Sequence, residues 1–189
     1  ARLSGFDRAG IYKEFDGEPG LVNAVIDKYA NEHVLPRMPI LESIESPCMT
    51  VKMVIDAFIF DNVLKDLSIY GIKDTTLKWP EPTKKAKGCC FYGLVISDSI
   101  LNMGSMTQKK IKEMDEKTRQ LMFSVFEKAE TKDLLREGVT AITAHEFYED
   151  QMLLLQLMRN RNYDEARMIA AGNFMLNSMF AEYVLTEKQ

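Results

Sequence analysis

Apolar residues recur along most of this chain at the spacing of helices that are buried on one side. The first such face has positions i, i+3, i+4 and i+7 filled by Val22, Val25, Ile26 and Tyr29. We expect this helix to stop before Pro36, because proline interrupts helical hydrogen bonding. Few segments show the alternation of a half-buried strand, so the pattern predicts an all-α protein.

A second helix is predicted from "SPCMTVKMVIDAFIFDNVLKDL". Ser46 suits the N-cap and Pro47 the first helical position, where a missing N–H costs nothing. We expect the helix to end near Gly71, with a buried face formed by Val51, Val54, Ile55, Phe58 and Ile59.

A stretch with two prolines and no helical period follows, "GIKDTTLKWPEP". Prolines without helical periodicity are typical of a connection between folding units. We therefore predict two packed helical subdomains joined by a short linker: an N-terminal domain at 1–72, the linker at 73–83 and a C-terminal domain at 84–189.

The second half opens with an almost wholly apolar run that breaks at "NMGSMT". Gly104 is interpreted as a left-handed C-cap after Asn102 and Met103, and Thr107 as the N-cap of the next helix. The break then forms a tight helix-turn-helix hairpin. The helix after it should carry a narrow apolar stripe of Ile111, Met114, Thr118, Leu121, Val125 and Phe126.

Two further helices are expected before the C-terminal end of the sequence. "TAHE", from Thr143 to Glu146, has capping-box spacing and introduces "FYEDQMLLLQLM", which is too apolar for a surface helix. The last helix contains Gly172, which suits a close helix crossing or marks a weak point.

Composition and motifs argue against catalysis. At 189 residues and 46% hydrophobic, the chain can bury one sizeable core or two small ones, and its apolar runs are too short to predict membrane spanning or a secretory signal. "HEFYE" lacks the second histidine of a zinc-protease motif, and the chain has only two histidines, His33 and His145. We expect no enzyme, no cofactor and no metal, and the three cysteines are interpreted as small buried hydrophobes.

Basic charge is concentrated in the middle of the chain. Residues 1–78 and 139–189 each have a net charge of −3, whereas residues 84–112 hold six lysines against the single acid Asp98. This basic patch consists of Lys84, Lys85, Lys87, Lys109, Lys110 and Lys112. The overall charge of −4 argues against a dedicated nucleic-acid binder.

Two segments resemble the matrix proteins of orthomyxoviruses. "GLVISDSILNMGSMTQ" is similar to the stretch of influenza matrix protein where an apolar helix ends in an Asn-x-Met-Gly turn before a threonine, a signature formed here by Asn102, Met103, Gly104 and Thr107. "MPILESIESPCMT" is similar to that family's Pro-Ile-Leu-Ser-Pro segment, with "ESIE" inserted. We identify the chain as resembling a member from a distant genus, most similar to the fish isaviruses.

The resemblance implies a structural protein of the virion that lines the inner face of the envelope. Such a protein self-associates into a layer, binds the anionic leaflet and links it to ribonucleoprotein during assembly and budding. It would work at the cytoplasmic face of the plasma membrane, with a nuclear stage left open. The lysines of the basic patch would contact lipid, and the acidic outer segments suggest a head-to-tail polymer.

Two alternatives stay open. An RNA-binding or ribonucleoprotein-binding protein would use the same lysines, with Trp79, Phe91 and Tyr92 stacking on bases. A helical adaptor without affinity for lipid or RNA would dock a partner helix through its methionine-rich surface.

Overall fold

The computed structural model describes residues 7–60, 67–79 and 104–184. The regular elements in these ranges are all helical, which confirms the all-α fold. Within the same ranges, the only strand-like pairing is an isolated antiparallel bridge between Leu135 and Val184.

The N-terminal part is a nearly continuous helical path. The first predicted helix ends at Tyr29, before Pro36 as expected, although further helical turns continue through this proline. Pro36 lies in the first turn of a 3-10 segment and Pro39 in the first turn of the next helix, positions where the missing N–H has no helical partner to lose. The path consists of α1 (Arg8–Glu14), α2 (Gly17–Tyr29), the π-helical turn η1 (Ala30–Val34), the 3-10 turn η2 (Leu35–Arg37) and α3 (Met38–Glu42).

The second predicted helix starts where expected and is α4 (Pro47–Phe60). The predicted end near Gly71 differs from the structure, since residues 67–70 form a separate 3-10 turn. The N–H of Met49 donates to the hydroxyl of Ser46 at 3.4 Å, so this serine caps the helix as expected. Val51 and Ile55 are buried, Val54 and Phe58 pack at the edge of the same core, and the side chain of Ile59 lies outside those described.

A short 3-10 turn, η3 (Leu67–Tyr70), precedes the expected linker and ends at Gly71 in a left-handed conformation with φ of 78°. Residues 71–79 contain no helix, as predicted, but they lie against the protein: Ile72 is buried and Trp79 packs on a core cluster. The division into two domains stays a prediction.

The long helix α6 (Ser105–Thr131) begins differently from the expectation. Gly104 is its N-cap, with an extended backbone at φ −60° rather than a left-handed C-cap. Because the helix starts two residues before it, Thr107 lies inside the first turn and is not the N-cap. Its side chain is buried. The apolar stripe is confirmed in part: Ile111, Val125 and Phe126 are buried. Met114, Thr118 and Leu121 are half-buried.

Helix α7 (Ala141–Asn160) starts earlier than "TAHE" predicted. Thr140 is the N-cap, and it exchanges hydrogen bonds with Thr143, whose hydroxyl accepts from the Thr140 N–H at 3.0 Å. Thr143 is therefore the far end of the capping box. Helix α8 (Glu165–Ser178) follows, capped by Asp164, and runs on into the π-helical turn η6 (Met179–Tyr183).

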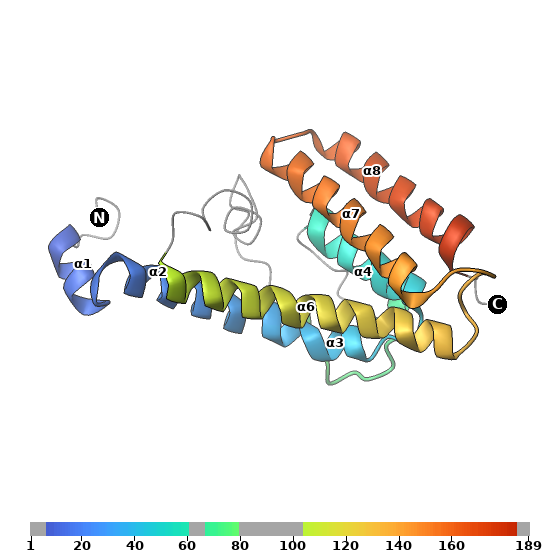
Figure 1. Ribbon diagram of the computed structural model, residues 1–189, viewed down its shortest axis with the longest axis horizontal. Coiled ribbons are helices and arrows are strands. Elements are labelled where there is room, and N and C mark those ends of the chain that lie inside the picture. The colour runs from blue at the N-terminus through green and yellow to red at the C-terminus, as the bar shows by residue number, and fades with distance from the viewer. Residues whose placement is uncertain (1–6, 61–66, 80–103, 185–189) are drawn as a thin grey trace.

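Helix α6 is the axis of the structure (Figure 1). Helices α2 and α3 lie along one side of it, while α4, α7 and α8 gather over its C-terminal half. The main core lies among α4, α6, α7 and α8, and a smaller cluster lies among α3, α4 and η3. Because α4 contributes Val51 to one and Met53 to the other, it joins the two cores.

Candidate functional site

The described half of the basic patch lies on the first two turns of α6. Lys109 and Lys112 are exposed and three residues apart, so they share one side of the helix. Lys110 is turned away from them and pairs with Asp27 of α2. Lys84, Lys85 and Lys87 lie outside the described residues.

The acidic neighbours of these lysines reduce their net charge. Lys109 lies 3.8 Å from Glu113, and both side chains are more than half exposed. Exposed pairs of this kind contribute about 0–1 kcal/mol, so an anionic ligand can compete with them. Lys112 has no ion pair among the described residues. The structure thus offers two exposed lysines on one side of the α6 start.

The helix-turn signature is only partly described. Thr107 is 1% exposed, and its hydroxyl donates to the side-chain oxygen of Asn23 at 2.9 Å. Together with buried Ile111, this hydrogen bond packs the start of α6 against α2. Thr107 is therefore a positioning residue for the lysines that follow it, while Asn102 and Met103 lie outside the described residues.

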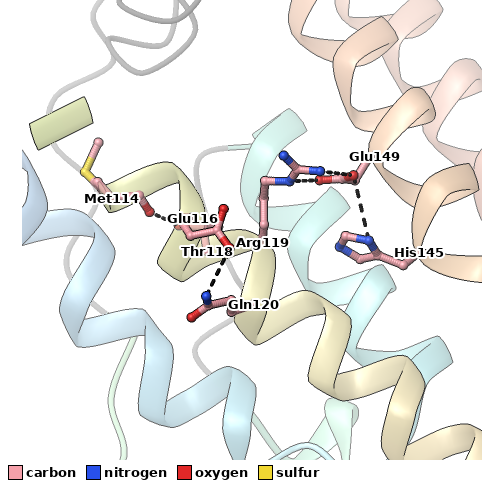
Figure 2. Close-up of polar contacts among 7 residues, drawn as sticks. All are labelled: Met114, Glu116, Thr118, Arg119, Gln120, His145 and Glu149. Atoms are coloured by element: carbon pink, nitrogen blue, oxygen red, sulfur yellow. Dashed lines mark hydrogen bonds and ion pairs between the residues drawn. The ribbon is translucent and has the colours of Figure 1, made fainter. Parts of the chain in front are cut away.

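A polar cluster that the sequence did not indicate joins α6 to α7 (Figure 2). Arg119 donates two hydrogen bonds to Glu149, from Nε at 2.6 Å and from its terminal amino group at 3.0 Å. The second oxygen of Glu149 lies 3.7 Å from Nδ1 of His145. His145 and Glu149 are four residues apart on α7, but nothing in the sequence pairs them with Arg119, because the two helices meet only in three dimensions.

His145 is a buried member of this cluster. Its imidazole lies between the rings of Phe123, at 5.4 Å, and Phe126, at 6.1 Å. Burial lowers the pKa of His145, although the nearby Glu149 carboxylate opposes the effect. Its Nε2 has no hydrogen-bond partner in the described structure. The neutral imidazole is therefore favoured near neutral pH.

Within residues 7–60, 67–79 and 104–184, no group of His, Cys, Asp and Glu side chains is placed to hold a metal ion. Both carboxylate oxygens of Glu149 accept hydrogen bonds from Arg119. The chemistry of this pair is that of a link between two helices.

The outer surfaces of α7 and α8 are unusually apolar. The sequence predicted a buried α7, but Leu153, Leu154 and Leu157 are 62%, 47% and 45% exposed. On α8, which packs beside α7, Phe174 is 65% exposed. With Ile142, these residues make up half of the ten large hydrophobic side chains that are exposed in the described ranges.

Charge is also missing from much of this surface. Residues 151–158 of α7 contain no charged side chain, and neither do residues 168–181 of α8 and η6. Large exposed apolar surfaces without charge are rare on monomeric proteins and mark sites of interaction. The run of three leucines at 153–155 was the available sequence signal, but of these only Leu155 is buried.

Comparison with known proteins adds no identity: no family model, curated protein or solved structure matches the chain. Among the described helices, none combines the length and the apolar character needed to cross a bilayer. The class defined by the fold is therefore an all-α helical protein with an exposed apolar surface and a basic helix start.

Proposed function

We propose that this protein is a non-enzymatic structural protein of the viral matrix type, which self-associates into a layer on an anionic membrane surface. The proposal draws on the resemblance to orthomyxovirus matrix proteins and on two surfaces of the described structure. It places the protein at the inner face of a viral envelope and at the cytoplasmic face of the host plasma membrane. There it links membrane to ribonucleoprotein.

The observation that carries the proposal is the uncharged, exposed outer surface of α7 and α8. Leu153 and Phe174 are each exposed by more than half, and exposed apolar side chains of this size are favoured sites of contact with a partner. Burying apolar area contributes about 25 cal/mol per Å². This favours a protein that works in contact with other macromolecules rather than alone.

The lysines support the membrane part of the proposal. A lysine held near an anionic leaflet contributes about 1 kcal/mol, so the two exposed lysines, Lys109 and Lys112, together contribute about 2 kcal/mol. Such an energy gives weak binding of a single copy. Many linked copies would bind firmly, because each tethered neighbour raises the effective concentration of the next contact. Self-association and membrane binding are therefore coupled.

The head-to-tail part of the proposal uses the uneven charge. The acidic outer segments of one copy, each with a net charge of −3, would face the basic middle segment of the next. A contact between two different surfaces leaves both free on the terminal copies, so it propagates into a polymer.

Co-sedimentation with liposomes tests the proposal. Full-length protein is mixed with anionic or neutral vesicles at low and high salt. We expect binding to anionic vesicles only, weakened by salt and rising steeply with protein concentration. Replacing Lys109 and Lys112 by Gln should weaken it severalfold.

A matched control replaces Lys117 and Lys128 by Gln, which removes the same charge from exposed positions further along α6. This variant should bind like the parent if position matters rather than total charge. Salt-dependent binding to single-stranded RNA without lipid binding would favour the RNA-binding alternative. Binding to neither would reject the matrix function and favour a helical adaptor.

A further inference from the structure

The outer face of α7 has a charge pattern that changes along its length. We define this face as Glu146, Asp150, Leu153, Leu157 and Arg161, which follow one another at intervals of three or four residues and therefore share one side of the helix. All five are exposed, and Leu154 lies beside them. The face is acidic at its start, apolar in the middle and basic at its end.

The charged residues of this face lack ion-pair partners in the described structure. The ion pairs among residues 7–60, 67–79 and 104–184 involve neither Glu146, Asp150 nor Arg161. The apolar middle is likewise uncovered, with Leu153 62% exposed. The same face thus has uncovered leucines and uncompensated charges of both signs.

From this pattern we infer that the outer face of α7 binds the same face of a second copy, with the two helices antiparallel around a two-fold axis near Leu154. A two-fold axis at Leu154 places Arg161 opposite residue 147 of the other copy, between Glu146 and Asp150. The same ion pairs form twice, and the leucines meet at the centre. A parallel pair would instead set Arg161 against Arg161 and acid against acid.

A membrane is a poorer occupant of this face, because Glu146 and Asp150 would be repelled by anionic lipid. A two-fold contact pairs a patch with the identical patch of a second copy, so the patch must be complementary to itself. This α7 pairing rests on the proposed self-association and would be one of the contacts that build the layer. The α7 face lies within the acidic segment 139–189, so the head-to-tail contact of the same layer would use the acidic segment 1–78 instead.

Charge exchange tests the contact in the full-length chain. The acidic variant Arg161→Glu has like charges along the whole face, and so does the basic variant with Glu146→Arg and Asp150→Arg. Each alone should associate at least tenfold more weakly than the parent by sedimentation velocity. Mixed in equal amounts, the two should form a heterodimer, since an acidic face then meets a basic one.

The control is Ile69→Glu, which places a charge at an apolar side chain 42% exposed on η3, outside the proposed contact. It should associate like the parent. Far-ultraviolet circular dichroism checks that each variant is folded. An unchanged association of Arg161→Glu, or failure of the mixed variants to pair, overturns the inference.

Liposome binding separates this inference from the proposed function. If the charge variants associate at least tenfold more weakly but keep salt-sensitive binding to anionic vesicles, both proposals stand. If the parent pairs through α7 and binds no vesicle, the matrix function fails while the α7 contact stands. If it binds vesicles steeply but the variants do so equally, the α7 contact is wrong.

Discussion

Arg119 and Glu149 form a two-bond pair that joins α6 to α7, with a guanidinium nitrogen on each carboxylate oxygen at 2.6 and 3.0 Å. The geometry is bidentate, which gives orientation as well as attraction. Since α6 also holds the lysines and α7 the exposed leucines, this pair fixes the relative position of the two candidate surfaces.

Replacing Arg119 by Met should lower the free energy of unfolding by about 1 kcal/mol, because the pair is partly exposed and screened by water. Urea unfolding measures the change. In a double-mutant cycle with Glu149→Gln, the two effects should overlap rather than add. Full additivity would show that the pair contributes nothing to stability.

Acidification should destabilise the protein through His145. Burial lowers the pKa of this imidazole in the folded state, so the unfolded chain takes up a proton first as the pH falls below about 6.5. Above about pH 6.5 His145 is neutral in both states and does not make stability depend on pH. Between that pH and the lower pKa of the folded state, the free energy of unfolding falls as the pH falls, by no more than about 1.4 kcal/mol per pH unit, because the unfolded chain binds one more proton.

Urea unfolding between pH 7.5 and 5 checks this dependence. The variant His145→Gln should show a smaller loss of stability with acid, whereas His33→Gln should retain the His145 component of the loss. Equal slopes in the parent and in His145→Gln would contradict the assignment.

Removing the hydroxyl of Thr107 should loosen the start of α6. In Thr107→Val the side-chain oxygen of Asn23 loses its donor at 2.9 Å, which costs about 1–2 kcal/mol in a buried setting. Thr107→Ser keeps the hydroxyl and serves as the control, losing only a methyl group. Hydrogen exchange at the first turns of α6 should accelerate in the valine variant alone.

Tyr70 should hold η3 against α4. Its hydroxyl donates to the carboxylate of Asp56 at 2.6 Å, and burial raises its pKa far above the usual value for tyrosine. Tyr70→Phe should therefore reduce the free energy of unfolding by about 1 kcal/mol. In a spectrophotometric titration, the parent should retain one more unionised tyrosine at pH 11 than this variant if the bond persists in solution.

Local patterns predicted much of the helical content. The cap at Ser46, the proline at the start of α4 and the buried stripe of α6 from Ile111 to Phe126 follow from the residues and their neighbours within one or two turns. The helix starts at Gly104 and Thr140 were misplaced because several small polar residues compete there, and the choice among them depends on packing.

The sequence by itself determined that this is an all-α protein, because helical periodicity and capping are local properties of the chain. Only the tertiary structure decided that His145 is buried beside Glu149 and that Leu153 and Leu157 are exposed. A periodic apolar pattern marks the helix faces that avoid water. The hydrophobic effect is non-directional, so the pattern does not specify which surface covers each face. Which helix covers which face is settled by the packing of α4, α6, α7 and α8 together, and it left the outer face of α7 uncovered.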